Sequence, residues 1–308
     1  MSNFKVNHIT NKSGKNGPVL AGITTVSSSG SMRFPSGNTN YRLTLPESNE
    51  NIVRDQLYAL YDAGRMESFG NHGMDWYDIS GNERHMTVPT IADTSGGTHR
   101  GVALDYNNGG GAKLGPTPTW WRSDWGRLYD FSVGVQGKYQ GFTVEMWYKH
   151  PSTTDRVHLW AFGHHNRGDQ SNVNMNLNDG RAIWVYTDNG SPYNAFGGSD
   201  GAYTDGTIRN LTYTYDVGAK NSGGTNGQGL AYMNGSLISG LTHTGDQQWR
   251  VNMSNGDGNY FSFANNHDGW AAVNMHNGSI IYKVAVYTKA LTAAEVLQNY
   301  NALSYRYS

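Results

Sequence analysis

Apolar and polar residues alternate along most of the chain after residue 51, with the two-residue period of a β-strand. The clearest case is the segment GFTVEMWYKH, where Phe142, Val144 and Met146 share one face of the predicted strand. The same pattern predicts further strands at 156–165, 172–178, 182–187, 208–215, 229–239, 260–264 and 280–287. Because no amphipathic helical segment separates these runs, they predict an antiparallel sandwich or barrel.

Two dipeptides predict where neighbouring strands turn back on each other. Asp179-Gly180 lies between NVNMNLN and AIWVYT, and Asn234-Gly235 lies inside GLAYMNGSLIS. Both dipeptides are typical of tight hairpins, and Asn-Gly favours a type I′ turn because both of its residues tolerate positive φ. We therefore expect two hairpins at these positions.

Helix signals are confined to two places. At the C-terminal end, Thr292 as N-cap and Glu295 three residues later form a capping box ahead of the apolar Val296. A second, shorter helix is predicted over Val53–Leu60. The rest of the chain is predicted to be strands and turns.

The chain divides into two parts of different character. Residues 51–304 carry the strand pattern and are predicted to form one domain. Residues 1–46 contain only short extended pieces, Asn3–Ile9 and Val19–Val26, separated by Ser/Gly clusters and prolines. Since this segment has too little apolar periodicity for a core of its own, it either attaches to a partner subunit or packs on its own sandwich.

Composition agrees with an all-β protein and excludes several functions. The 308 residues include 40 Gly and 20 Tyr, and only 15% are charged, against about 25% in an average domain. The net charge of −1 and the lack of any Lys/Arg run argue against nucleic acid as a partner. Without cysteine there is no disulfide or thiolate metal site. We expect neither a signal peptide at MSNFKVNHITNKSG nor membrane insertion.

The order of several motifs resembles the laminin-G/concanavalin A-like family. GSIIYKVAVYTKALTAAEVLQNYNA (278–302) is similar to the family's closing strand, Tyr-Asn-x-Ala-Leu and capped helix, although Thr288 replaces Asn. The family's opening signature is matched by Trp76, Asp78, Ser80, Gly81 and Asn82. GVALDYNN (101–108), the strand with Trp147 and LAYMNGSLIS match the segments between. The resemblance implies an all-β antiparallel concanavalin A-like (laminin-G-like) jelly-roll sandwich, with Leu291 plugging its open end.

The two ends of the chain resemble parts of virus particles. NYNALSYRYS (299–308) is similar to the ends of such domains in virion proteins of tailed bacteriophages. SNFKVNHITNKSGKNGPVLAGITTVSSSGSMRFPSG is similar to a module that begins several structural proteins of contractile-tailed cyanophages. The resemblance implies that residues 1–46 are an extended attachment segment that binds other virion proteins. By analogy with fibres we expect a homo-oligomer located in the virion.

Enzymatic activity is not expected. Laminarinase-like enzymes of this fold carry paired carboxylates on one strand, because alternate residues face the same cleft. The chain has six glutamates, and Glu145 stands alone on the predicted central strand, without an acidic residue two positions away. No Gly-x-Ser-x-Gly elbow occurs either.

A calcium ion is the cofactor that the resemblance suggests, since laminin-G-like domains often hold Ca²⁺ at the rim with oxygen ligands. Its ligands here are Asp75, Asp78 and Asn82 in one loop, and Asp105 and Asn107 in another. The same residues also suit ordinary turns, because Asx side chains bond to their own backbone. Tyr282, where many family members have Asp, weakens the calcium interpretation.

A cluster of aromatic residues is the candidate binding surface. Trp120, Trp121 and Trp125 lie with Arg122 in the loop-like insertion LGPTPTWWRSDWGRLYDF. Exposed tryptophans would grip a sugar ring or a partner surface, whereas tryptophans that fold back would extend the core. Together these features favour a phage virion component, in a fibre, tail or capsid surface, that displays the sandwich for subunit contact or host-surface glycan adhesion. The alternative is a free carbohydrate-binding lectin.

Overall fold

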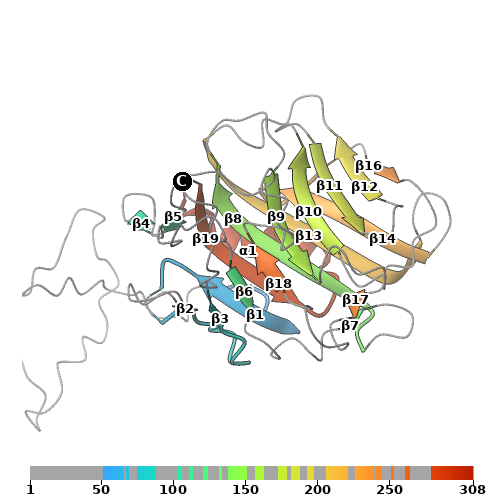
Figure 1. Cartoon of the computed structure of the whole chain (residues 1–308). Coiled ribbons are helices and arrows are strands. Elements are labelled where there is room, and N and C mark those ends of the chain that lie inside the picture. The colour runs from blue at the N-terminus through green and yellow to red at the C-terminus, as the bar shows by residue number, and fades with distance from the viewer. Residues whose placement is uncertain are drawn as a thin grey trace, which may run out of the picture. The chain divides into compact units, whose positions relative to one another are not determined.

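The chain forms an antiparallel β-sandwich with a short C-terminal helix, seen in a computed structural model (Figure 1). The structure describes residues 51–65, 67–68, 75–87, 103–105, 111–113, 121–123, 132–133, 138–150, 157–162, 173–178, 182–187, 193–197, 206–220, 226–238, 241–243, 251–252, 261–263 and 279–307. The described part therefore confirms the predicted fold class. The attachment segment, residues 1–46, lies outside the described residues, and its role stays a prediction.

The first sheet is built on the long central strands. Seven of its strands run, in order across the sheet, as β15 (Ser236–Leu237), β14 (Asn226–Met233), β13 (Ile208–Lys220), β8 (Gly141–Lys149), β19 (Ile280–Tyr287), β5 (Gly111–Lys113) and β4 (Ala103–Asp105). The eighth, β1 (Leu57–Asp62), pairs with the C-terminal half of β19, while β5 pairs with the first two residues of the same strand. All of these pairs are antiparallel.

The second sheet has nine strands and faces the first. In order they are β16 (Leu241–His243), β12 (Tyr193–Gly197), β11 (Ala182–Thr187), β10 (Val173–Asn178), β9 (Val157–Phe162), β18 (Phe261–Phe263), β6 (Trp121–Ser123), β3 (Met86–Thr87) and β2 (Asp75–Trp76). A separate ribbon pairs β17 (Val251–Asn252) with β7 (Ser132–Val133). The pairing of β10 with β11 confirms the first predicted hairpin, whose turn lies outside the described residues.

The core between the sheets is rich in aromatic rings. Phe142 of β8 makes edge contacts with Trp160 and Phe162 of β9, at centroid distances of 6.2 and 5.4 Å. Tyr213 of β13 lies 6.0 Å from Trp160. All four side chains are buried, which explains why the alternation of Phe142, Val144 and Met146 predicted β8 so well.

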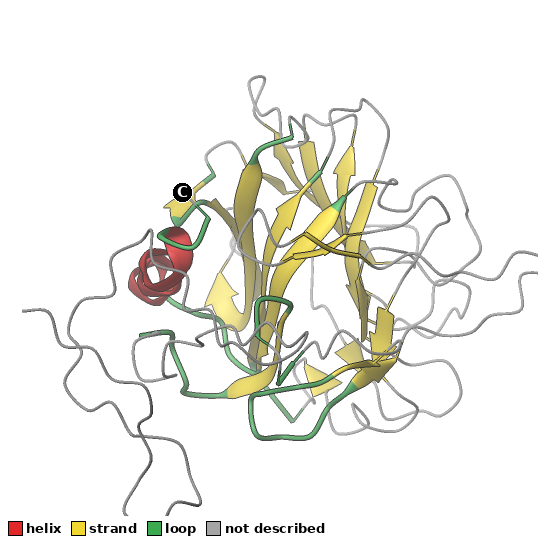
Figure 2. Cartoon of the chain, turned by 90° about the vertical axis from the view of Figure 1, so that its left-hand side faces the viewer, coloured by secondary structure: helices red, strands yellow, loops and turns green. Residues whose placement is uncertain are grey.

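The first sheet is covered on its outer face as well. A second apolar cluster, separate from the inner core, packs the helix α1 (Ala293–Ser304) and residues 52–53 against this face (Figure 2). Leu291, which was expected to plug the open end of the sandwich, is buried in this outer cluster together with residues of α1. The outer face also buries polar side chains of β8, β13 and β19. As a result both faces of β8 and β19 are shielded from water.

Helix α1 begins as the sequence predicts. The hydroxyl of Thr292 accepts a hydrogen bond from the backbone N–H of Glu295, and the Glu295 carboxylate accepts one from the N–H of Thr292. This capping box satisfies two of the N–H groups that every helix start leaves without partners. Among the described residues no helix is long and apolar enough to cross a membrane.

The second predicted hairpin is also confirmed. Met233 pairs directly with Ser236, which leaves Asn234 and Gly235 as a two-residue turn. Their φ angles are 51° and 77°, so both residues are in the left-handed region that a type I′ turn requires. A Cβ at Gly235 would lie 3.1 Å from side-chain atoms of α1, so glycine also lets the turn approach the helix.

The predicted helix over Val53–Leu60 is wrong. Its second half belongs to strand β1, whose six residues are all buried and which pairs with β19. Unlike β8, whose outer face buries polar side chains, β1 is apolar on both faces and therefore shows almost no alternation. Over so few residues, an apolar run cannot be told from a turn or two of apolar helix by periodicity alone.

Candidate functional site

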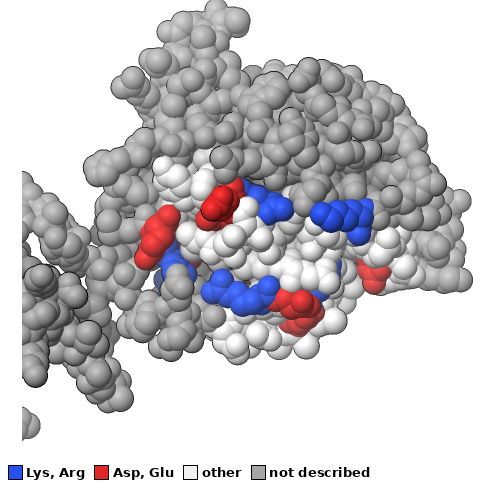
Figure 3. All heavy atoms as spheres, turned by 90° about the horizontal axis from the view of Figure 1, so that it is seen from below, with Lys and Arg blue, Asp and Glu red and all other residues white. Residues whose placement is uncertain are grey.

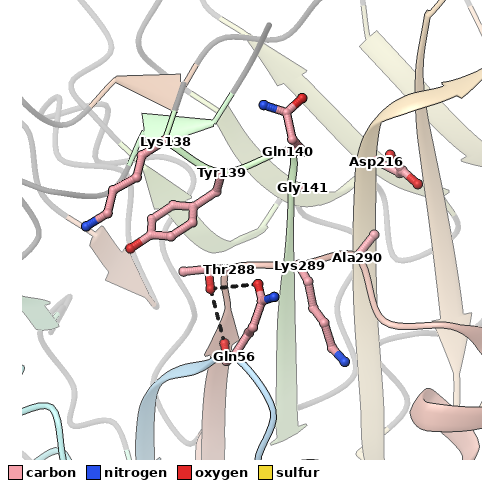
Figure 4. Close-up of a pocket in the computed structure, with 9 residues that line it drawn as sticks. All are labelled: Gln56, Lys138, Tyr139, Gln140, Gly141, Asp216, Thr288, Lys289 and Ala290. Atoms are coloured by element: carbon pink, nitrogen blue, oxygen red, sulfur yellow. Dashed lines mark hydrogen bonds between the residues drawn. The ribbon is translucent and has the colours of Figure 1, made fainter. Parts of the chain in front are cut away.

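A pocket of about 580 Å³ lies at the end of the first sheet where β8 begins and β19 ends. It is lined by residues before β1, before β8, within β13 and after β19 (Figure 4). The described lining residues are Gln56, Lys138, Tyr139, Gln140, Gly141, Asp216, Thr288, Lys289 and Ala290. Four segments far apart in sequence thus meet at this site.

Gly141 allows these segments to come together. A Cβ on this residue would lie 2.6 Å from the carbonyl oxygen of Tyr215 and 2.9 Å from the backbone nitrogen of Ala290. Both are backbone atoms and therefore cannot move aside cheaply. Next to it, the Val217 N–H donates to the carbonyl of Gln140 over 2.8 Å, which ties β13 to the approach of β8. The glycine therefore lets the backbones of β13 and of the chain after β19 pack closely against the start of β8, beside the pocket.

Gln56 is held by contacts with the chain after β19. It has a φ of 55°, and its carbonyl accepts a 3.0 Å hydrogen bond from the Thr288 N–H. The Thr288 hydroxyl lies 3.3 Å from Gln56 Oε1 and donates to it (Figure 4). Among the described residues none accepts a hydrogen bond from the Gln56 amide nitrogen Nε2, while the bond from Thr288 orients the amide.

Tyr139 forms an aromatic wall. It is half-buried and meets Tyr58 of β1 edge-on, with ring centroids 6.3 Å apart. The guanidinium of Arg84 lies 3.7 Å from the centre of the Tyr58 ring, and the amine of Lys138 lies 5.2 Å from that of Tyr139. These packed cations and rings hold Tyr139 in place.

Asp216 supplies the carboxylate of the pocket. Its Oδ1 accepts hydrogen bonds from the N–H groups of Gly218 and Ala219, at 2.8 and 3.3 Å. Its Oδ2 accepts none from the described residues. In Figure 4 Asp216 and Tyr139 lie on opposite sides of the start of β8. The carboxylate is thus oriented through one oxygen and keeps the other for a ligand.

The positive charge of Lys289 is neutralised locally. Its amine lies 2.7 Å from carboxylate oxygens of both Asp55 and Glu295. Partial burial lowers the pKa of Lys289, but these hydrogen bonds outweigh it and the pKa is raised. For Glu295, burial raises the pKa, yet the bonds from Lys289 and Thr292 leave it lowered. Figure 3 shows acidic and basic side chains interspersed on the described part of one face, without a large area of one sign.

The predicted metal residue Asp78 acts as a turn organiser in the structure. Its Oδ1 accepts from the N–H groups of Leu60 and Ser80, both at 2.8 Å. Its Oδ2 accepts from the Ser80 hydroxyl at 2.8 Å and from the Arg84 N–H at 3.0 Å. Four donors therefore occupy this buried carboxylate, which ties the loop to β1.

Of the other predicted calcium ligands, Asn82 is also used in bonds to β1. Asn82 turns its amide N–H₂ to the carbonyls of Leu57 and Tyr58, both at 3.0 Å. Asp75 and Asp105 lie in β2 and β4, and Asn107 is outside the described residues. Among the residues described, no three acidic or histidine side chains come together to hold a metal. Calcium binding stays a prediction.

The predicted tryptophan site falls partly within a strand. Trp121 and Arg122 belong to β6, which pairs with β18 on one side and β3 on the other. This segment is therefore an interior strand of the second sheet and not a loop. Trp120 and Trp125 lie outside the described residues, and a binding role for the cluster stays a prediction.

Glu145, the lone acidic residue of the central strand, is fully buried under α1. Its Oε1 accepts from the indole N–H of Trp147 and the amide of Asn210, at 2.9 and 3.1 Å. Its Oε2 accepts from the amide of Asn299 at 2.8 Å. With no exposed surface, Glu145 cannot reach a dissolved substrate.

The fold and motif order agree with a match to a known family. A laminin-G family model, described as the concanavalin A-like lectin/glucanases superfamily, matches residues 124–297. The chain belongs to this superfamily. A search of curated protein sequences finds no match.

Solved structures similar to this superfamily member include toxin binding domains and a sialidase. The botulinum neurotoxin serotype G binding domain is 14% identical, with a TM-score of 0.55 over 80% of this chain and 51% of its own. The serotype D/C VPI 5993 binding domain is 14% identical, with a TM-score of 0.54 over 82% and 53%. Trypanosoma rangeli sialidase in complex with sialic acid is 12% identical, with a TM-score of 0.50 over 82% and 33%. The chain thus spans about half of the toxin domains and a third of the sialidase. At such identities the likeness shows the fold alone.

Sequence reasoning missed the pocket. Gln56, Tyr139 and Asp216 belong to no motif, and only the folded strand ends bring them together. One signal was available: in KYQGF a polar and aromatic tripeptide precedes Gly141 at the start of the best-predicted strand.

Proposed function

We propose that this protein is a non-catalytic, carbohydrate-binding sandwich, and that the pocket beside Gly141 is its glycan site. The observation that carries the proposal is the pocket itself, which combines the aromatic wall of Tyr139 with a fixed amide donor on Gln56 and an open carboxylate oxygen on Asp216. A sugar ring needs such a set, because it presents an apolar face beside hydroxyls that both donate and accept.

The charges of the pocket favour neutral sugars. Asp216 Oδ2 can accept hydrogen bonds from sugar hydroxyls but repels a sugar carboxylate. Of the two lysines in the described lining, Lys289 is already paired with two carboxylates, and the Lys138 amine lies 5.2 Å from the centre of the Tyr139 ring. None of the described lining residues is arginine, the side chain that binds carboxylates in bidentate fashion. We therefore expect neutral glycans to bind better than sialylated ones.

Two features support binding without catalysis. Glycoside hydrolysis uses a pair of carboxyl groups on either side of the scissile bond. Among the described lining residues Asp216 is the sole acidic side chain. Glu145, the lone acidic residue of the central strand, is buried beneath α1.

The test is a glycan array with the full-length protein, followed by calorimetry on the best ligand. Asp216→Asn keeps the Oδ1 acceptor and removes the charge, and we expect at least a tenfold loss of affinity, which corresponds to about 1.4 kcal/mol. Tyr139→Ala should weaken binding similarly. Tyr77→Ala is the matched control, since Tyr77 is 42% exposed and lies outside the pocket. Binding that survives both pocket variants places the glycan elsewhere.

We also propose a biological setting for this binding protein. Residues 1–46 would attach the protein to a phage particle, as a homo-oligomer, so that the sandwich is displayed for adhesion to host glycans. The support is the resemblance of that segment to the opening module of cyanophage structural proteins. Mass spectrometry of purified particles should detect the full-length protein and not a variant that lacks residues 1–46. If particles contain neither, the protein acts as a free lectin.

A further inference from the structure

A buried charged pair on the outer face of the first sheet has no role in the proposed binding site. Glu145 lies on the central strand β8, and Lys283 lies on its neighbour β19. The side chains of both are 0% exposed, and the amine of Lys283 is 3.6 Å from Glu145 Oε1. Burial of two charges is expensive unless further hydrogen bonds satisfy them.

Lys283 is not satisfied in this way. Its ammonium group has three N–H donors, yet it makes no hydrogen bond in the described structure. A β-bulge places it here: Tyr282 and Lys283 together oppose Trp147, so both consecutive residues point to the outer face. Buried polar groups without partners are rare and each needs an explanation.

The amide of Asn210 lies on the other side of the same carboxylate. In the register of the sheet, Lys283 on β19 and Asn210 on β13 are both opposite Trp147 of β8. Asn210 Nδ2 donates to Glu145 Oε1 over 3.1 Å, and that oxygen is the one nearest the Lys283 amine. β13 and β19 flank β8 and are therefore about 10 Å apart. A lysine and an asparagine side chain together can bridge this distance.

The carbonyl of Asn210 is prepared for attack, whereas the other amide at the carboxylate is fully used. The hydroxyl of Thr212 lies 3.4 Å from Asn210 Oδ1 and donates to it, which polarises the C=O bond. Asn299 instead accepts from the Val53 N–H and donates to both Glu145 and Tyr287. Asn210 is therefore the electrophile that the geometry favours.

We propose that Lys283 and Asn210 form an intramolecular isopeptide bond, with Glu145 as the catalytic proton carrier. The ammonium of Lys283 gives one proton to the Glu145 carboxylate, and the free amine attacks Cγ of Asn210. A second amine proton passes to the departing NH₂ group, the Cγ–Nδ2 bond breaks, and ammonia leaves. The products are a neutral secondary amide and a neutral Glu145 carboxylic acid.

The reaction resolves the energetic conflict at this site. A buried ammonium without acceptors and a buried carboxylate become neutral groups, which removes the charge-burial penalty. The amide joins β13 to β19 across the central strand β8. The chain has no cysteine, so this covalent link would take the place that a disulfide has in extracellular proteins. The three buried side chains are held on neighbouring strands around one carboxylate oxygen, and such fixed positioning lowers the barrier of an intramolecular reaction.

The experiment is intact-protein mass spectrometry of the denatured full-length chain, with peptide mapping. The expected mass is below the sequence mass by one ammonia, about 17 Da, and a branched peptide should join Lys283 to Asn210. Asn210→Asp should lose water instead, about 18 Da. Glu145→Gln and Lys283→Arg should show the full sequence mass.

Three results would overturn the proposal. The first is a wild-type mass equal to the sequence mass, a measurement that needs no variant to fold. The second is a 17 Da deficit that persists in Lys283→Arg, because succinimide formation at Asn234-Gly235 loses the same ammonia without lysine. A branched peptide at Asn299 instead of Asn210 also contradicts the assignment.

Discussion

The Asn299→Ala substitution probes how α1 is held on the first sheet. Asn299 sits in the middle of the helix and is 1% exposed. Its Oδ1 accepts the Val53 N–H at 2.7 Å, and its Nδ2 donates to Glu145 Oε2 at 2.8 Å and to the Tyr287 hydroxyl at 2.9 Å. One side chain thus joins the helix, the central sheet and the chain before β1.

The magnitude follows from the groups that alanine leaves without a partner. The Val53 N–H and one Glu145 oxygen each lose a buried hydrogen bond, at about 1–3 kcal/mol apiece. The expected loss of unfolding free energy is therefore about 4 kcal/mol. The Tyr287 hydroxyl loses a bond from a neutral donor and adds little, since burial already raises its pKa and keeps it protonated.

The assay is urea unfolding followed by tryptophan fluorescence. With a slope of about 3 kcal/mol per molar urea, the midpoint should fall by more than about 1 M. Gln298→Ala is the matched control, because its side chain bonds to Asn51 at the surface and its loss should cost less than about 0.5 kcal/mol. If the two variants unfold at similar urea concentrations, the network does not hold the helix as described.

Two further predictions concern the start of β8 and the first turn of α1. Gly141→Ala should lower the stability of the fold by about 1–3 kcal/mol in thermal unfolding, because the new Cβ would meet backbone atoms of Tyr215 and Ala290. Gly218→Ala is the control and should show no such loss, because the nearest atom to its new Cβ would be 3.5 Å away. Glu295 has a lowered pKa in the fold, so it stabilises the protein above its usual pKa and loses this effect as pH falls through the lowered value. Glu295→Gln keeps the cap but not the charge, and should flatten the acid limb of a stability–pH curve; an unchanged limb would contradict the assignment.

The parts of the fold that sequence could predict are those where neighbours in sequence decide the conformation. The type I′ turn at Asn234-Gly235 and the capping box at Thr292 depend on residues within a few positions, and both are confirmed. Strand β8 was predictable because one face is apolar and the other is mixed. β1 was not, because apolar residues occupy both of its faces, and this removes the apolar–polar alternation that marks a strand.

The candidate site was harder to predict for a related reason. Asp78 stood out in the sequence as a ligand, yet its carboxylate is used by four donors of its own loop and of β1. Gln56, Tyr139 and Asp216 each stand about 80 positions from the next along the chain, as their numbers show. The pairing of β8, β13 and β19 brings them together. No local sequence pattern predicts that these three residues lie close together.

The most direct test of the account is the structure of the protein with its best array glycan soaked into crystals. We predict that a sugar ring packs against Tyr139 and that its hydroxyls form hydrogen bonds with Gln56 Nε2 and Asp216 Oδ2. A glycan bound instead near the predicted tryptophan cluster at 120–125, with the pocket empty, would contradict the assignment of the site.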